Sequence, residues 1–366
     1  MKKIIILFYA LIMNACIFAF GNDLPPISLK NIDNNIYTKD NLIGSDYVCI
    51  ILYSNHCKIS QKFEYAIKEI TKKFKSKNSK VVVVSPNNED AIIPDELAYS
   101  DLSDGFEDMK IRYFSNKFNF PYLYDGKSQT VSNYLKSKTT PHAFLFNKQR
   151  KLIYNGRIGD YNDPDNLKKS DLYKSFLNAL DGNEEYKKTK VHGTSIKTNK
   201  DIKLAENVKR RYSEEKVTIR EIDKQTLEFF LEYGTVNPTV FYLWTPNDAN
   251  CRQNLLALSE IFKIFRKRGF KLYTICVDAS EKDALICLEN AQLSSANFRM
   301  RGSEIIALTE YIPQNAMKIS PLMVFFGKNK IFKHSHIGGL SKQKIKKHLI
   351  NEFDYNISKD LHKDNY

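Results

Sequence analysis

A cysteine with unusual surroundings stands at position 57, in the stretch YSNHCKIS (residues 53–60). An apolar run, residues 48–52, precedes this stretch and predicts a buried strand, and the residues that follow it are spaced like one face of a helix. Backbone N–H groups at the start of a helix lack partners within the helix and lie at the positive end of its dipole. Both effects stabilise a thiolate, so we expect Cys57 to be a nucleophile. The alternative is an ordinary thiol in a turn.

Polar neighbours of Cys57 favour the same chemistry. Ser54 and His56 come just before the sulfur, and Ser60 follows one helical turn later, where its hydroxyl could donate to sulfur. Further along the chain, Thr140 and Pro141 stand at the entrance of a predicted strand. A cis bond there would aim the Thr140 backbone at an approaching peptide or thiol. We therefore take these five residues with Cys57 as the candidate site.

The other cysteines and histidines give weaker signals. The sequence has six cysteines and no Cys-x-x-Cys pair, and we expect packing roles for Cys49, Cys276 and Cys287. No Cys/His set has zinc spacing, so neither a metal nor another cofactor is expected. His142 either lines the Cys57 cleft or is exposed at the start of its strand. The acidic stretch at residues 87–104 is interpreted as a solvated loop, and the pair His334 and His336 as a weak metal candidate.

Element patterns predict an α/β fold built twice. Each half alternates strands with helices, which favours a parallel sheet core, and then adds a strand hairpin and a closing helix. We predict a first domain over residues 22–182, a charged linker or tail over 183–215, and a second domain over 216–366. The repeat of about 180 residues indicates domain duplication rather than a solenoid.

The net charge indicates which partners to expect, and the N-terminal segment indicates where the protein is located. The formal net charge is +14, but the lysines are scattered rather than clustered, so we expect no nucleic-acid partner. Residues 1–21 combine Lys2 and Lys3 with an apolar stretch and a small residue before Asn22, which is typical of a secretory signal. An uncleaved membrane anchor and lipidation of Cys16 are the alternatives. The protein is therefore expected to be exported, to a periplasmic or extracellular location, or to be membrane-anchored.

The first half resembles the redoxin group of thioredoxin-like proteins, the relatives of alkyl hydroperoxide reductase and thiol-specific antioxidant proteins. The resemblance covers residues 25 to about 200. It depends on four segments: YSNHC, FPYLYDGKSQTVSNYL, TTPHAFLFNKQRKLIYNGRI and HGTSIK. It implies a mixed, mainly parallel sheet flanked by helices, with Cys57 as nucleophile and Ser54 in the position of the Ser or Thr of peroxide-reducing relatives.

Two departures from this group concern the mechanism. The proline that peroxiredoxins carry earlier in the loop is replaced by Ile50, which weakens the expectation of peroxidase activity. Relatives often have a cysteine where HGTSIK has Thr194. If that cysteine resolves the oxidised nucleophile, this protein needs a thiol from another molecule.

The second half is similar to the thioredoxins of cytochrome c maturation. WTPNDANCR (residues 244–252) matches their Trp-x-x-x-Cys-x-x-Cys-Arg motif, with Asp248 in place of the first cysteine and Cys251 in place of the second. Ser320 and Pro321 match the cis-proline position. This resemblance implies a second, degenerate thioredoxin-like domain that is redox-inactive by itself, with Asp248 serving as a helix N-cap.

Two hypotheses follow for the whole chain. The first is an exported thiol-dependent oxidoreductase that acts on a protein or small-molecule disulfide, or on a peroxide, and depends on an external resolving thiol. The second is a catalytically silent tandem thioredoxin-like protein that binds a partner in the cell envelope.

Overall fold

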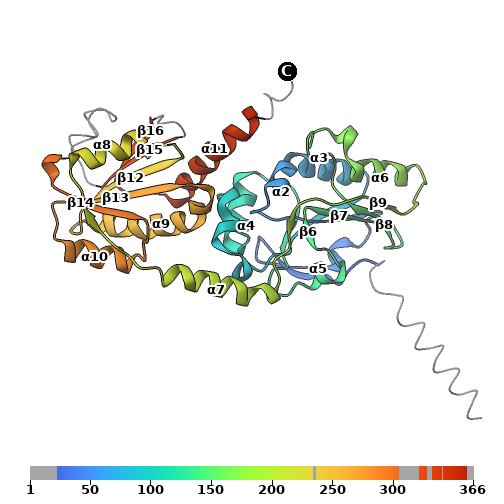
Figure 1. Cartoon of the computed structure of the whole chain (residues 1–366). Coiled ribbons are helices and arrows are strands. Elements are labelled where there is room, and N and C mark those ends of the chain that lie inside the picture. The colour runs from blue at the N-terminus through green and yellow to red at the C-terminus, as the bar shows by residue number, and fades with distance from the viewer. Residues whose placement is uncertain (1–22, 234–235, 305–320, 328–331, 340, 361–366) are drawn as a thin grey trace, which may run out of the picture. The chain divides into compact units, whose positions relative to one another are not determined.

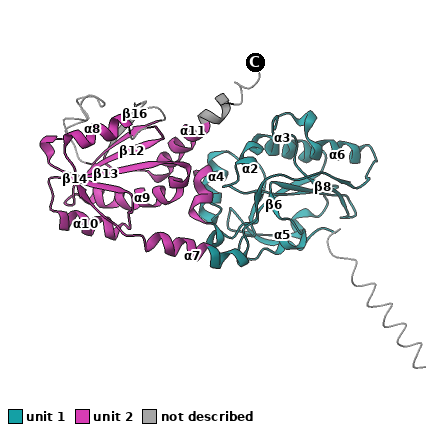
Figure 2. Ribbon diagram, in the orientation of Figure 1, with its two compact units in different colours: residues 1–92, 102–204 teal, residues 93–101, 205–366 magenta. Residues whose placement is uncertain are grey.

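The computed structural model describes residues 23–233, 236–304, 321–327, 332–339 and 341–360, and Figure 1 shows their arrangement. The chain divides into two compact units, residues 1–92 with 102–204 and residues 93–101 with 205–366, coloured separately in Figure 2. The predicted signal segment, residues 1–21, lies outside the described residues. Along the residues that the structure describes, no helix combines the length and apolar character needed to cross a membrane.

The first unit is built on an eight-stranded sheet. Its order is β2-β1-β5-β4-β3-β7-β8-β9, with β3, β4 and β5 parallel and β7 antiparallel to β3. The strands are β1 (Ser28–Asn31), β2 (Ile36–Thr38), β3 (Val48–Leu52), β4 (Lys80–Ser85), β5 (Tyr122–Tyr124), β7 (His142–Phe146), β8 (Leu152–Gly156) and β9 (Lys187–Lys188). A separate short pair joins β6 (Thr139–Thr140) to β10 (Thr194–Ser195).

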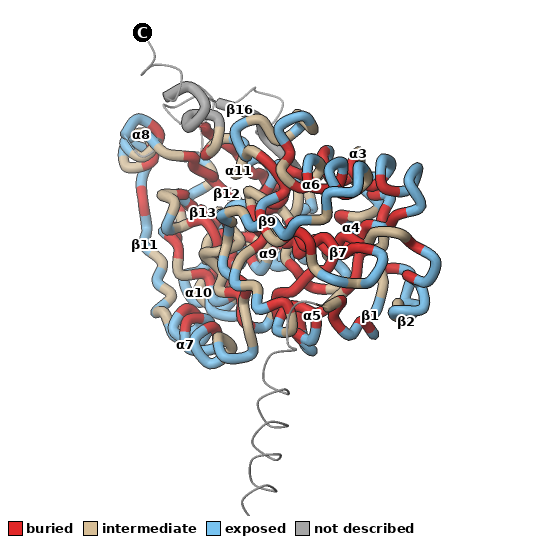
Figure 3. Tube along the Cα trace, turned by 90° about the vertical axis from the view of Figure 1, so that its right-hand side faces the viewer, coloured by how far each residue is buried: buried red, intermediate tan, exposed pale blue. Residues whose placement is uncertain are grey.

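Helices cover both faces of this sheet. They are α2 (Lys58–Lys62), α3 (Glu64–Lys75), α4 (Phe106–Ser115), α5 (Thr130–Tyr134) and α6 (Asp171–Leu180). Because side chains of a strand alternate between faces, Cys49 and Ile51 pack in the core beneath α3 and α6, whereas Ile50 packs in the core that includes α5. Figure 3 shows the buried residues concentrated in the central strands such as β7.

The second unit repeats this architecture. Its six-stranded sheet has the order β11-β14-β13-β12-β15-β16. The strands are β11 (Arg220–Glu221), β12 (Thr239–Trp244), β13 (Lys271–Val277), β14 (Ala296–Met300), β15 (Leu322–Phe326) and β16 (Phe332–Ile337). The helices are α7 (Ile202–Ser213), which begins just before the unit boundary, α8 (Lys224–Tyr233), α9 (Ala249–Phe265), α10 (Glu281–Asn290) and α11 (Lys342–Asp360).

The order and sense of five strands are the same in both units. In each, three strands pair in parallel, the fourth pairs antiparallel with the third, and the fifth pairs antiparallel with the fourth. The order is β5-β4-β3-β7-β8 in the first unit and β14-β13-β12-β15-β16 in the second. The predicted mixed α/β sheets are therefore confirmed in both halves, although four of the seven strand pairings in the eight-stranded sheet of the first unit are antiparallel. The strand β14 was not predicted, because the polar Asn297 interrupts its apolar pattern. In the structure Asn297 is buried, and its side-chain oxygen accepts a hydrogen bond from Thr274 at 2.8 Å.

The unit boundaries differ from the predicted domains in two respects. The predicted charged linker or tail, residues 183–215, is divided between the units: residues 183–204 belong to the first, and the remainder, from within α7 onward, belongs to the second. Residues 93–101, between β4 and β5 of the first unit, pack within the second (Figure 2). There Ala98 is 1% exposed and Asp95 pairs with Lys267 at 2.5 Å, contacts that sequence spacing does not predict.

Candidate functional site

Cys57 lies in the loop between β3 and α2, as predicted, and is the N-cap residue of α2. Its sulfur accepts a hydrogen bond from the backbone N–H of Ser60 at 3.4 Å. The predicted single helix is broken at Phe63 into the short α2 and the longer α3. A five-residue helix has little dipole of its own, so local N–H and hydroxyl groups, rather than a long helix, determine the electrostatics of the sulfur.

The pKa of the Cys57 thiol is lowered. Burial alone would raise this pKa, but the side chains and backbone amides of Ser60 and Thr194 more than offset it by stabilising the thiolate. The backbone N–H of Ser60 donates to the sulfur, whereas its hydroxyl has no hydrogen-bond partner that meets the geometric criteria. The direction of the shift agrees with the predicted thiolate, and the contribution of Thr194 comes from the position where relatives carry a cysteine.

Cys57 is fully buried, with 0% of its surface exposed. Its thiol donates to the carbonyl oxygen of Thr140 at 3.2 Å, so the protonated form also has a partner. The Thr140–Pro141 bond is cis. The structure therefore brings Cys57, Ser60 and Thr140 together as predicted, but it places the sulfur beneath other residues rather than in an open cleft.

Asp104 is a site residue that the sequence did not reveal. Although it belongs to the acidic stretch interpreted as a solvated loop, Asp104 is 0% exposed and lies beneath the Cys57 loop. Its carboxylate accepts hydrogen bonds from Ser54 Oγ at 2.9 Å, from the backbone N–H of Asn55 at 2.5 Å and from the Asn87 amide at 2.7 Å. Residue type and spacing alone do not distinguish such a buried carboxylate from its exposed neighbours.

Ser54 and His56, which we predicted to stabilise the sulfur, both lie within hydrogen-bond distance of Asp104. His56 Nδ1 lies 2.5 Å from Asp104 Oδ2 and 3.0 Å from Ser54 Oγ. Serine and aspartate thus contact the same imidazole nitrogen, and the three residues do not form a relay of the serine-hydrolase type, which uses both nitrogens. Burial alone would raise the pKa of the Asp104 carboxyl, but His56, Asn87 and Ser54 hold it below the usual value. We interpret this network as a clamp that fixes the loop.

His142 does not contribute to the Cys57 site through its hydrogen bonds. Its Nδ1 lies 2.7 Å from Ser137 Oγ and its Nε2 lies 2.7 Å from Asn155 Oδ1. Of the cysteines with predicted packing roles, Cys49 and Cys276 are buried, whereas Cys287 is only half-buried. No disulfide joins any of the cysteines that the structure describes. The side chains of His334 and His336 lie outside the described part of the chain.

The second unit carries the degenerate counterpart of the site. Asp248 caps α9, as predicted, and its Oδ1 accepts from the backbone N–H of Asn250 at 2.7 Å and of Cys251 at 3.4 Å. Cys251 is 0% exposed, and its sulfur accepts from the N–H of Thr245 at 3.4 Å. Pro321 is buried. Its predicted partner Ser320 lies outside the described residues.

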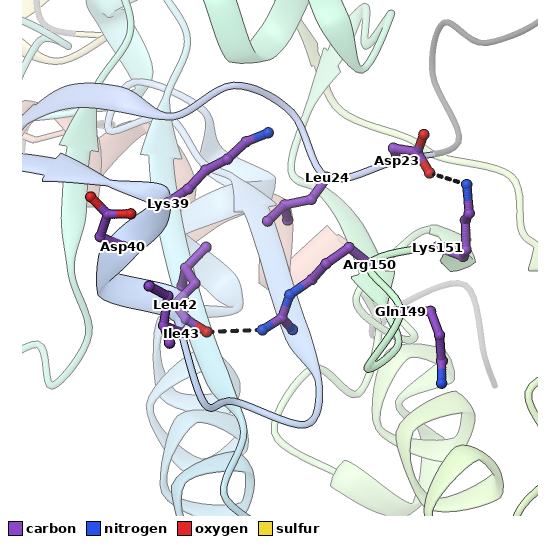
Figure 4. Close-up of a pocket in the computed structure, with 9 residues that line it drawn as sticks. All are labelled: Asp23, Leu24, Lys39, Asp40, Leu42, Ile43, Gln149, Arg150 and Lys151. Carbon is purple, nitrogen blue, oxygen red and sulfur yellow. Dashed lines mark hydrogen bonds and ion pairs between the residues drawn. The ribbon is translucent and has the colours of Figure 1, made fainter.

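A pocket of about 490 Å³ lies on the first unit, and Figure 4 shows the residues that line it. Its charged residues are largely engaged: Arg150 donates to the Leu42 carbonyl at 2.9 Å, and Lys151 pairs with Asp23 at 2.6 Å. None of the candidate site residues lines this pocket. Within the described ranges, no group of three or more His, Cys, Asp or Glu side chains could hold a metal ion.

The fold and the cysteine loop define the class of the first unit as thioredoxin-like. Residues 20–155 match the model of the AhpC/TSA family, which bears out the predicted resemblance of the first half to the redoxin branch of that superfamily. This match supports thiol-dependent oxidoreduction as the broad activity class. No curated protein sequence matches the chain.

Solved structures with similar folds come from several bacteria. An uncharacterized conserved protein from Geobacillus kaustophilus is 25% identical, covers 50% of this chain and 93% of its own, and has a TM-score of 0.41. A hypothetical protein from Sinorhizobium meliloti 1021 is 24% identical, covers 50% and 96%, and has a TM-score of 0.42. A thiol:disulfide interchange protein of the thioredoxin family from Chlorobium tepidum TLS is 13% identical, covers 32% and 81%, and has a TM-score of 0.31.

Proposed function

We propose that the protein is an exported thiol-dependent oxidoreductase that uses Cys57 as its single nucleophilic cysteine. The observation that carries this proposal is the position of Cys57 at the start of α2, where its sulfur accepts from the Ser60 N–H, in a unit that matches the AhpC/TSA family; the lowered pKa of the thiol supports it. The neighbours Ser60 and Thr194 stabilise the thiolate, and the Asp104 clamp holds the preceding loop in place.

Thiol–disulfide exchange is the favoured reaction. The Cys57 thiolate attacks one sulfur of a substrate disulfide, forming a mixed disulfide and releasing the other sulfur as a thiolate. A thiol from another molecule then attacks the mixed disulfide, so that Cys57 leaves as thiolate and the external sulfur takes its place on the substrate. An external thiol is needed because Thr194, which adjoins Cys57, offers a hydroxyl rather than a second sulfur.

Peroxide reduction is the second reaction open to the same thiolate. Here Cys57 attacks one peroxide oxygen, the O–O bond breaks, and the products are a sulfenic acid and an alcohol or water after proton uptake. Two external thiols then reduce the sulfenic acid through a mixed disulfide. The replacement of the peroxiredoxin proline by Ile50 makes this reaction the less favoured one.

The test compares wild-type protein with Cys57→Ser in two assays, reduction of a disulfide substrate by dithiothreitol and reduction of hydrogen peroxide. We expect Cys57→Ser to lower catalysed disulfide reduction to the background rate. Cys287→Ser is the matched control and should keep the wild-type rate, because Cys287 is a half-buried cysteine in the second unit. Full activity of Cys57→Ser would refute the proposal, and activity on peroxide alone would select the second reaction.

A silent binding protein is the competing function, favoured by two observations. Cys57 is 0% exposed, and Asp248 replaces the attacking cysteine in the second unit. Under this alternative, wild-type protein and Cys57→Ser should be equally inactive toward both substrates, and the protein should retain an envelope partner irrespective of Cys57.

Export is proposed from residues 1–21 alone. Mass spectrometry of protein recovered from an exporting host should find Asn22 as the first residue if the segment is a cleaved signal. An intact N-terminus in the membrane fraction would indicate an anchor instead.

A further inference from the structure

A short segment of the first unit, residues 190–197, lies against the Cys57 site, and we call it the strap. Its strand β10 pairs antiparallel with β6, so that Thr194 is opposite Thr140 and Ser195 is opposite Thr139. The N–H of Ile196 extends this pairing by donating to the carbonyl of Lys138 at 2.9 Å. Since the Cys57 thiol donates to Thr140, the strap and the thiol share one backbone residue.

The strap adjoins the buried sulfur and is itself partly exposed to solvent. Cys57 is 0% exposed, whereas Thr194, whose side chain and amide act on the sulfur, is partly exposed and Gly193 is exposed. A pocket of about 20 Å³ beside it is lined by Ile59, Pro141 and His192, among others. That volume holds about one water molecule, which is too small for a disulfide substrate.

The strap is fastened at both ends and closely packed at its centre. Thr189, just before it, donates its N–H to the carbonyl of Asn155 at 3.0 Å, and Lys197 at its end donates to Asn87 Oδ1 at 2.8 Å. At Gly193, an added Cβ would lie 1.8 Å from the carbonyl oxygen of Thr140. Any side chain at residue 193 must therefore push the centre of the strap away from β6.

We propose that the strap is an internal gate: β10 occupies the edge of β6 above Cys57 in the resting protein, and its local release exposes the thiol. Short segments held by few backbone pairs open at lower free energy than the whole fold, so the gate opens without global unfolding. Its biological use rests on the proposed function, since a substrate must displace the strap before Cys57 can attack.

The wild-type protein contains a matched control for this gate. Cys49 is also 0% exposed, but it lies on the central strand β3, where only unfolding of the sheet can expose it. Native protein is alkylated with iodoacetamide over a series of low urea concentrations, and each cysteine is followed by peptide mass spectrometry. We expect Cys57 to react at least about 100-fold faster than Cys49, with little dependence on urea. Equal rates with the same urea dependence would overturn the gate.

Gly193→Ala should open the gate, and Gly44→Ala is the matched control. A Cβ at Gly44 meets no atom within 4 Å, although its backbone is left-handed, with a φ of +78°. We expect Gly193→Ala to speed Cys57 alkylation about tenfold without changing Cys49, and Gly44→Ala to leave the ratio of the two rates unchanged. An unchanged Cys57 rate in a folded Gly193→Ala protein would contradict the gate. If Gly193→Ala raises the alkylation rates of both cysteines together, the variant has unfolded more widely. The ratio of the Cys57 and Cys49 rates in wild-type protein then tests the gate.

Failure of the gate and failure of the proposed function give different results. If Cys57 reacts much faster than Cys49 yet supports no turnover even in Gly193→Ala, the gate stands and the oxidoreductase proposal fails. If Cys57-dependent turnover is present but the two cysteines are labelled at equal rates, the function stands and the gate fails.

Discussion

His142 is a residue whose ionisation should influence the stability of the first unit. Burial lowers the pKa of His142 to about 4, although its hydrogen bond to Asn155 acts in the opposite direction. The unfolded chain, with an ordinary imidazole pKa near 6.5, then binds more protons than the folded chain between about pH 6.5 and 4. The stability that His142 confers is complete above pH 6.5 and is lost as the pH falls through this window.

We predict that the free energy of unfolding of the first unit decreases by about 2–3 kcal/mol between pH 7 and 4 because of His142. Urea unfolding followed by far-UV circular dichroism at several pH values measures it. His142→Gln should flatten this part of the profile, whereas His192→Gln, which changes an exposed histidine, should not. An unchanged profile in His142→Gln would show that other groups cause the acid sensitivity.

At the scale of the element, the loop between β3 and α2 depends on a carboxylate from a distant part of the chain. Asp104 precedes α4, yet it accepts hydrogen bonds from a side chain, a backbone N–H and an amide beneath Cys57. Removing the charge from a buried acceptor leaves its donors poorly satisfied, and such changes cost several kcal/mol.

Asp104→Asn should therefore destabilise the first unit by about 2–4 kcal/mol and disorder the Cys57 loop. Asp90→Asn is the control from the same acidic stretch, because the Asp90 side chain is 60% exposed, and its effect should stay within about 0.5 kcal/mol. Chemical denaturation of both variants provides the comparison. If the two substitutions had equal effects, Asp104 would not be the clamp described above.

The sequence predicted elements better than the contacts between them. Apolar runs and helical spacing located β3, α3, β4 and β12, because these patterns are local. They placed Cys57 at a helix start and Asp248 at an N-cap for the same reason. Asp104 and the strap over Cys57 were missed, since each depends on contacts between residues about 50 or more positions apart. A buried aspartate and a solvated one have the same local pattern.

At the scale of the whole molecule, residues 93–101 belong to the second unit, although the residues on both sides of them in the sequence belong to the first. In the second unit, Arg268 donates to the carbonyl of Ala98 at 2.6 Å, and Asp95 accepts from the Tyr212 hydroxyl at 2.9 Å. Ala98 itself joins the core that contains Trp244, the only tryptophan of the chain. Fluorescence of Trp244 therefore reports on the unit that these nine residues complete.

Ala98→Asp should destabilise the second unit by about 2 kcal/mol or more, because it places an unpaired charge in that core. The midpoint of the Trp244 fluorescence transition in urea would decrease accordingly. Ala91→Asp introduces the same charge at a residue that is 2% exposed in the first unit, and it should leave that midpoint unchanged. A reversed pattern would assign residues 93–101 to the first unit.

The polypeptide crosses from one half to the other three times, at residues 92/93, 101/102 and 204/205. A single proteolytic nick near residue 204 would therefore leave two fragments still interlocked through nine residues donated by the first. A fragment of residues 22–204 would expose Ala98, because it lacks the core that buries this residue. A fragment of residues 205–366 would lack Ala98 in that core. The second unit therefore depends on a segment that lies within the sequence of the first, and residues 205–366 alone do not contain all of it.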